Sequence, residues 1–231
     1  MVVSTTALAH ISAATDDPFK VLVSTILSAR TRDPVTEAAS ARLFDKFPDP
    51  ASLARASEAA VEKLIKPVTF YRIKAPRIIE VARVIEQKYG GVVPDRIEDL
   101  LELPGVGRKT ANCVLVYGFK LPAVPVDVHV HRISNRIGLV KTKTPEETET
   151  ELSKIYPRKY WLDVNENFVA FGQTICRPGV PKCYVCDLRP ICDYYRSVVS
   201  KTKTARAKSV RSVPAAAVGR PSSPSGRSVF R

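Results

Sequence analysis

The sequence predicts an all-α protein. Three Asp-Pro pairs, at 17–18, 33–34 and 49–50, each place an aspartate suited to a helix N-cap before a proline suited to the first helical position. Apolar residues recur at helical spacing, and no stretch shows the sustained alternation of a β-strand. At 231 residues and 45% hydrophobic content, the chain can form one or two small domains with a real core.

Two long helices are expected first. After Pro18, apolar side chains at positions 19, 22, 23, 26 and 27 share one helix face. Residues 72–89 carry a second apolar face that ends at Gly90-Gly91. These residues are expected to form one helix, with Pro76 as an alternative start because proline suits the first turn of a helix.

A glycine hairpin follows. Residues 97–103 predict a short helix, Pro104 and Gly105 end it, and 108–116 predict a second helix. Outward-facing amides of Gly105, Val106, Gly107 and Arg108 would lie at a helix N-terminus, which favours a phosphate. An ordinary helix–helix connection is the structural alternative.

Lys109 stands in the first turn of the second hairpin helix, and Asp127 lies eighteen residues further on. A lysine acts as a nucleophile only when neutral, and burial or a helix N-terminus would favour that form. The segment from 126 on is expected to be either a strand or the start of a helix with Asp127 as its N-cap, and the capping carboxylate could also stabilise positive charge in a cleft. The alternative for Lys109 is a solvated surface charge.

Four of the five cysteines lie near the C-terminal end: Cys176, Cys183, Cys186 and Cys192. Their C-x6-C-x2-C-x5-C spacing can enclose one metal centre. An iron–sulfur cluster, a zinc ion and disulfides are the three alternatives at this point. The fifth, Cys113, is expected to be a small buried hydrophobe.

Composition narrows the class of protein. No apolar run reaches the length of a membrane-spanning helix, and no signal-peptide pattern stands at the N-terminus, so an intracellular protein without a membrane is expected. Of the formal charge of +13, the segment 197–231 carries +8, with no acidic residue. This segment is predicted to be a disordered basic tail, either passive or a tether to DNA.

Four motifs together, in this order, resemble the endonuclease III family of DNA glycosylases in the helix-hairpin-helix superfamily. They are LPGVGRKTAN (103–112), VDVHVHRISNR (126–136), FGQTIC (171–176) and the cysteine spacing. The resemblance covers about residues 15–196. It implies a six-helix bundle over 15–125 that contains the helix-hairpin-helix (97–117). It also implies an iron–sulfur domain made of 1–14 plus 126–196, with DNA bound in the cleft between the two.

Carried over onto this sequence, the resemblance assigns Lys109 and Asp127 as catalytic and the four C-terminal cysteines as ligands of a [4Fe–4S] cluster. It implies a bifunctional DNA glycosylase and AP lyase. Such an enzyme removes oxidised pyrimidines such as thymine glycol from double-stranded DNA and nicks the strand through a lysine Schiff base. A monomer is expected. The alternatives are a mismatch uracil or thymine glycosylase of the same fold, and a zinc-stabilised DNA-binding module without activity.

Two departures from the family concern the residues that fill the gap left by a flipped base. The family often has glutamine where this chain has Arg30, and glycine where Thr69 precedes the expected apolar wedge, Phe70. Arg177 and Lys182, between the first two cluster cysteines, are expected either to contact phosphates or to be solvated surface charges.

Overall fold

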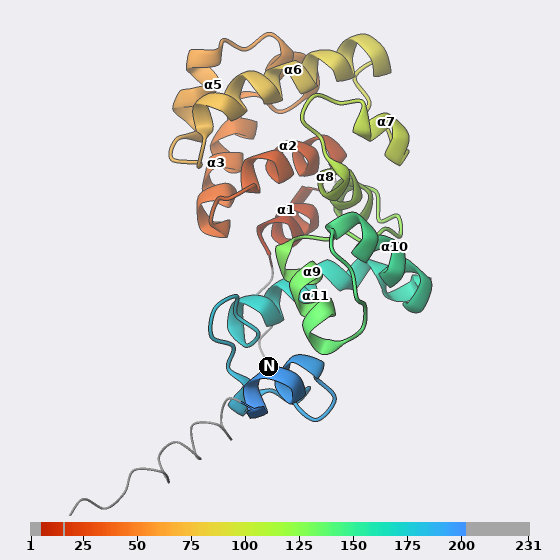
Figure 1. Cartoon of the computed structure of the whole chain (residues 1–231). Coiled ribbons are helices and arrows are strands. Elements are labelled where there is room, and N and C mark those ends of the chain that lie inside the picture. The colour runs from red at the N-terminus through yellow and green to blue at the C-terminus, as the bar shows by residue number, and fades with distance from the viewer. Residues whose placement is uncertain (1–5, 16, 202–231) are drawn as a thin grey trace, which may run out of the picture.

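The computed structural model describes residues 6–15 and 17–201, and over these residues it consists of helices and connecting segments without a β-strand (Figure 1). The all-α prediction is therefore confirmed. The α-helices are α1 (Ala7–Thr15), α2 (Pro18–Ser28), α3 (Asp33–Lys46), α4 (Pro50–Ala54), α5 (Glu58–Ile65), α6 (Tyr71–Tyr89), α7 (Ile97–Leu101), α8 (Arg108–Cys113), α9 (Val128–Ile137), α10 (Pro145–Ile155) and α11 (Trp161–Thr174). Short 3-10 or π segments are η1 (Val114–Gly118), η2 (Arg158–Tyr160), η3 (Cys183–Val185) and η4 (Tyr195–Val199).

The first and larger body contains α1 to α8 and is built around α2. Apolar residues face outward from α2 on every side, and Val21, Leu22, Val23 and Leu27 are fully buried, as expected for a helix surrounded by others. One continuous hydrophobic core runs from Leu8 to Ala123. Helix α1 packs against α2 and α3 in this body, whereas residues 1–14 were expected to belong to the second body.

Two of the three expected N-caps form. The Asp17 carboxylate accepts a hydrogen bond from the Phe19 amide (2.9 Å), and Asp49 forms a capping box with Ser52. The prediction is wrong for Asp33, which is the first residue of α3 rather than its cap. Its carboxylate is instead engaged by the backbone amide at the start of α1.

The helix expected over 72–89 is confirmed as α6, which starts at Tyr71, and the alternative start at Pro76 is wrong, because the helix continues through the proline. A proline inside a helix removes the hydrogen bond to the carbonyl four residues earlier. That carbonyl belongs to Arg72, which is exposed, so water can replace the missing donor. The helix ends as predicted at Gly90, which is left-handed with φ 61°.

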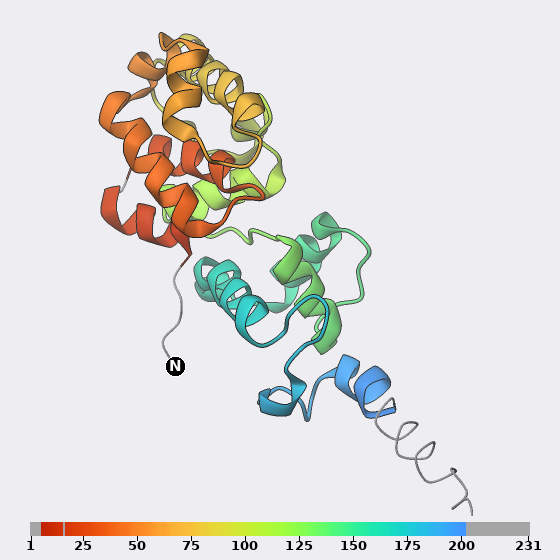
Figure 2. The same cartoon turned by 90° about the vertical axis from the view of Figure 1, so that its left-hand side faces the viewer.

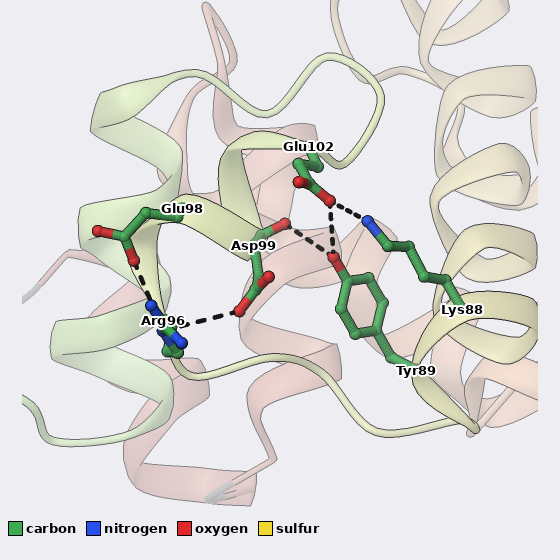
Figure 3. A network of polar contacts seen from close by, with 6 residues as sticks. All are labelled: Lys88, Tyr89, Arg96, Glu98, Asp99 and Glu102. Carbon is green, nitrogen blue, oxygen red and sulfur yellow. Dashed lines mark hydrogen bonds and ion pairs between the residues drawn. The ribbon is translucent and has the colours of Figure 1, made fainter.

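A polar network joins the end of α6 to α7, the first helix of the glycine hairpin (Figure 3). The Lys88 ammonium and the Tyr89 hydroxyl both donate to the Glu102 carboxylate, and the hydroxyl also lies 3.4 Å from the Asp99 carbonyl. Arg96 pairs with Asp99 at 4.0 Å. The network links the end of α6 to the first helix of the hairpin within the larger body.

The second, smaller body contains α9, α10 and α11 and has a separate core of Val124, Val126, Val130, Val140, Leu152 and Val164. Figure 2 shows the extended segment that crosses from the larger body to the start of α9. The cysteine-bearing loops continue from α11 at the far end of this body. The predicted basic tail lies outside the described residues from position 202 on. Over the described residues, no helix combines the length and apolarity that crossing a membrane requires.

Candidate active site

A cavity of about 520 Å³ brings together residues that are far apart in the sequence. The end of α2 and the loop after it contribute Arg30, α8 contributes Lys109, and the start of α9 contributes Asp127. Three of the residues singled out from the sequence therefore line one cavity. The cavity also reaches α11, so it lies where the two bodies meet.

Lys109 is half-buried in the first turn of α8. Burial lowers the pKa of this lysine, whereas a Cys113 thiolate and the Asp127 carboxylate raise it, and together these effects place it above its ordinary value. The Cys113 contribution, however, requires an ionised thiol. Burial raises the pKa of Cys113, so this residue is a neutral thiol at pH 7 and contributes no charge there. At neutral pH, desolvation of Lys109 is therefore opposed mainly by the carboxylates.

Cys113 is fully buried, as predicted. It lies one helical turn after Lys109, so the two side chains are neighbours on the same face of the helix.

Asp127 is the N-cap of α9, as predicted. One carboxylate oxygen, Oδ1, accepts hydrogen bonds from the amides of His129 (2.8 Å) and Val130 (2.9 Å). The second oxygen takes no part in the cap and is available to the cavity, which Asp127 lines. A fixed carboxylate of this kind can stabilise a positive charge that develops beside it without reorganising.

The hairpin differs in detail from the expected row of outward-facing amides. Gly105 is left-handed (φ 72°), and a Cβ there would lie 2.6 Å from the Arg77 side chain, so glycine is required. The Val106 side chain is buried in the core and its amide donates to the Leu103 carbonyl (3.1 Å) rather than facing outward; its contact with DNA stays a prediction. Gly107 has open space above it, because a Cβ at this position would have nothing within 4 Å.

Arg108 and the two expected gap-filling residues occupy exposed positions. Arg108 forms an ion pair with Glu149 of α10 (2.9 Å), which joins the hairpin to the smaller body. Arg30 and Phe70 are both exposed and both have left-handed backbone conformations, with φ of 57° and 59°. Such conformations are uncommon for residues other than glycine and have to be held by their surroundings.

Several residues that position the site were not identified from the sequence. The Asn165 side chain donates to the Pro125 carbonyl (3.0 Å) and accepts from the Tyr117 hydroxyl (3.3 Å), which anchors the segment leading to Asp127. Asn112 also reaches this segment, at the Val124 carbonyl. The sequence did carry one signal for them: each asparagine is a polar residue within an apolar helix pattern. A buried side-chain amide of this kind usually hydrogen-bonds to backbone groups.

Gly172 and Asp33 were also missed. Gly172 of α11 allows α9 to approach closely, since a Cβ there would overlap the His129 ring. Asp33 places a second carboxylate in the cavity, and burial, followed by repulsion from Glu37, raises the pKa of this carboxyl. Neither role leaves a local pattern in the sequence, because each depends on a contact between distant segments.

The four C-terminal cysteines line one small cavity at the end of the smaller body, together with apolar side chains. All four are free thiols. Arg136 organises the loop that follows Cys176: its guanidinium lies 3.6 Å from the Cys176 sulfur and donates to the carbonyls of Arg177 and Pro178 (both 2.7 Å). Burial, with repulsion from neighbouring cysteines, raises the pKa of the Cys183 thiol.

Arg177 is exposed, and its side chain donates to the Gln173 carbonyl (3.3 Å). Lys182 is half-buried, and its amide donates to the Ile175 carbonyl (2.9 Å). Both residues lie in the loop of the cysteine cavity and neither lines the Lys109 cavity. Their contact with DNA stays a prediction.

Comparison with known proteins defines the class first. Residues 23–158 match the profile of the HhH-GPD superfamily of base excision DNA repair proteins. The fold also matches a thermostable thymine-DNA glycosylase at 26% identity, with a TM-score of 0.70 over 82% of this chain and 94% of that one. The chain is therefore a helix-hairpin-helix protein of base excision repair.

Within that class, the chain belongs to the endonuclease III family. It is 55% identical to endonuclease III of Thermotoga maritima over 180 residues, which cover 78% of this chain and 84% of that protein. The structure of a trapped endonuclease III–DNA covalent intermediate matches with a TM-score of 0.74 at 34% identity, covering 78% of this chain and 85% of that one. An Arabidopsis thaliana homologue, described as chloroplastic, is 38% identical over 84% of this chain and 53% of that protein.

Endonuclease III is a DNA glycosylase with AP lyase activity, so this chain is a bifunctional enzyme of base excision repair that binds damaged DNA. The alternative of a DNA-binding module without activity is excluded by this membership.

Proposed function

We propose that this enzyme removes oxidised pyrimidines from double-stranded DNA with Lys109 as nucleophile and Asp127 as the group that stabilises the cationic sugar. The observation that carries the proposal is the shared cavity, in which a half-buried lysine and a helix-capping carboxylate lie together. The match to an endonuclease III–DNA covalent intermediate supports the same chemistry.

DNA binding would begin at the hairpin, where the open space above Gly107 leaves room for a phosphate. Arg30 and Phe70 would then enter the stack as the damaged nucleotide rotates out. Extrusion costs a few kcal/mol and is least unfavourable for damaged or badly paired bases, which supplies part of the selectivity. The basic segment 197–231, most of it outside the described residues, would add electrostatic attraction to the phosphates.

The neutral Lys109 amine would attack the sugar carbon C1′ with its lone pair. The bond between C1′ and the base breaks, and its electrons leave with the base, which takes up a proton. The nitrogen then loses a proton, the C1′–O4′ bond of the sugar ring breaks, the ring oxygen takes up a proton, and the C–N bond becomes a protonated imine. Loss of a proton from C2′ expels the 3′ phosphate, which nicks the strand by β-elimination. Asp127 would stabilise the positive charge that forms at C1′.

Burial and the neighbouring carboxylates act on the protonation of Lys109 in opposite directions. A lysine with an ordinary pKa near 10.4 is almost entirely protonated at pH 7. Desolvation by the surrounding cavity favours the neutral amine, whereas the carboxylates of Asp127 and Asp33 favour the ammonium and hold the pKa of Lys109 up, so the attacking amine would be the minority neutral form.

We further propose that Cys176, Cys183, Cys186 and Cys192 hold a [4Fe–4S] cluster. The donor set has the right chemistry: the four thiols line one cavity whose remaining lining is largely apolar, although among the described residues they are not drawn together into a metal-binding arrangement. Four thiolates in such a cavity repel one another unless a cationic centre binds them. Bound there, the cluster would act as a structural centre that fixes the loop carrying Arg177 and Lys182.

We also propose the domain boundaries: a bundle that includes α1, carries the hairpin and ends near residue 125, and a cluster domain over 126–196. The enzyme would act as an intracellular monomer at the DNA.

Substrate preference is tested by comparing single-turnover excision from three duplexes that carry thymine glycol, a G·U pair or a G·T pair. The proposal expects the fastest release from thymine glycol. Faster release from G·U or G·T would establish the alternative, a mismatch glycosylase with the same fold. The similarity of the fold to that of a thymine-DNA glycosylase is the observation that favours this alternative.

The cluster is tested by the visible absorption and the iron content of the purified protein. Brown protein with about four irons per chain is expected, and Cys183→Ala should lose the colour. Colourless protein with one zinc per chain would contradict the proposal.

A further inference from the structure

Arg30 and Phe70, the two residues expected to enter the DNA, lie on neighbouring loops. Arg30 follows α2, and Phe70 is the residue before α6. The loops are joined directly, because the Thr69 amide donates to the Thr31 hydroxyl (3.3 Å). Thr31 directly follows Arg30 and Thr69 directly precedes Phe70, and both Arg30 and Phe70 have a left-handed backbone.

Lys74 connects the same two loops from beneath. It lies one turn into α6, and its residue surface is only 7% exposed. Its ammonium donates to the carbonyls of Leu27 and Ala29 (both 2.7 Å) and contacts the Thr31 hydroxyl (3.4 Å). An ammonium has three donors, and these three contacts use all of them.

The acceptors show what the lysine holds. Leu27 and Ala29 present carbonyls at the C-terminal end of α2, where helix carbonyls lack partners and the helix dipole is negative. The chain turns there into the left-handed Arg30. On the other side, the Lys74 amide donates to the Phe70 carbonyl (3.0 Å). One residue therefore binds the backbone on both sides of the gap between the loops.

Stability alone does not account for a lysine at this position. Within the described residues no carboxylate pairs with Lys74, and burial lowers its pKa to about 8. A buried charge without an ionic partner is unfavourable, and apolar side chains of similar size are often at least as stabilising. The lysine is explained if the geometry of the two loops has to be fixed.

We propose that Lys74 is a positioning residue that fixes Arg30 and Phe70 relative to each other, so that both enter the duplex together when the damaged nucleotide leaves the stack. This inference rests on the proposed function. Without the Lys74 ammonium, the two side chains are still present, but the loops that carry them lose their buried link and are joined only by the Thr69–Thr31 hydrogen bond. A misplacement of about 1 Å at such a site can lower a rate by about 10²-fold.

The test compares duplex with single-stranded substrates, because only a duplex has to be opened. Lys74→Met is measured for cleavage at an abasic site in both forms. Cleavage in the duplex is expected to fall about 10- to 100-fold, while cleavage of the single strand stays near the wild-type rate. An equal fall on both substrates, or no fall on either, would overturn the inference.

Two further variants separate positioning from general damage to the fold. Thr31→Val removes the hydroxyl shared by Thr69 and Lys74 at nearly constant volume, and should show the same loss confined to the duplex. Lys120→Met is the matched control: Lys120 also binds a backbone carbonyl, that of Tyr117 (3.0 Å), in the same body. It should leave the ratio of duplex to single-strand cleavage unchanged.

A readout without chemistry distinguishes failure of this inference from failure of the proposed function. The duplex carries a tetrahydrofuran abasic analogue with 2-aminopurine opposite it. Wild-type protein should raise the 2-aminopurine fluorescence as the base loses its stacking, and Lys74→Met should bind without this rise. If the wild-type protein cleaves none of the abasic substrates, the proposed function is contradicted and the role of Lys74 is not. An identical fluorescence rise with Lys74→Met would contradict the role of Lys74 alone.

Discussion

Asp127 combines a structural and a chemical role, and two substitutions separate them. Its Oδ1 atom accepts both hydrogen bonds of the α9 cap, from the amides of His129 and Val130. Asparagine caps helices about as well as aspartate, whereas alanine loses about 1 kcal/mol. For a chain of this length, 1 kcal/mol corresponds to about 2–4 °C in melting temperature. Asp127→Asn should therefore melt about 2–4 °C above Asp127→Ala.

Activity should not follow stability in this pair. Both substitutions remove the negative charge that faces the cavity, and loss of one such electrostatic group typically lowers a rate by about 10²–10³-fold. Single-turnover base release from a thymine glycol duplex and thermal unfolding by circular dichroism measure the two effects. The reasoning is refuted if Asp127→Asn retains the wild-type rate, or if both variants melt at the same temperature.

Three further predictions concern residues that support the site. Asn165→Leu leaves two buried polar partners unsatisfied and should cost about 1–3 kcal/mol, measured by urea unfolding; an unchanged midpoint would contradict the anchoring role. Gly172→Ala adds a Cβ that overlaps His129 and should destabilise by about 1–3 kcal/mol, whereas Gly179→Ala, with nothing within 4 Å, should have a much smaller effect. Because burial lowers the pKa of Lys74 to about 8, the unfolded chain binds more protons between pH 8 and about 10.5. The free energy of unfolding of the wild type should thus rise over this window relative to Lys74→Met, and parallel profiles would contradict the lowered pKa.

Much of the fold was predictable from local signals. Asp17 and Asp49 with their prolines begin helices as expected, and Gly90 ends one, because caps depend on a few neighbouring residues. Asp33 and Pro76 show where local rules fail. The Asp33 carboxylate is engaged by α1, and the proline is tolerated because it lies on an exposed side of α6.

The chemically active residues of the site were predictable from the sequence, whereas most of the residues that position them were not. Lys109 and Asp127 stand in recognisable motifs, and the structure brings them into one cavity. The residues that hold them, such as Asn165 and Lys74, act through contacts with segments 40 or more positions away in the sequence. No local sequence pattern marks such a contact, so these roles can be assigned only from the three-dimensional structure.

The central claim is that Lys109 forms a covalent imine with the sugar. Borohydride reduction during reaction with a thymine glycol duplex tests it most directly, with Lys109→Gln and Lys109→Arg beside the wild type. We predict a protein–DNA adduct with the wild type and none with either variant. An adduct that survives both substitutions would place the nucleophile elsewhere. No adduct with the wild type, on thymine glycol or on a plain abasic site, would contradict imine chemistry altogether.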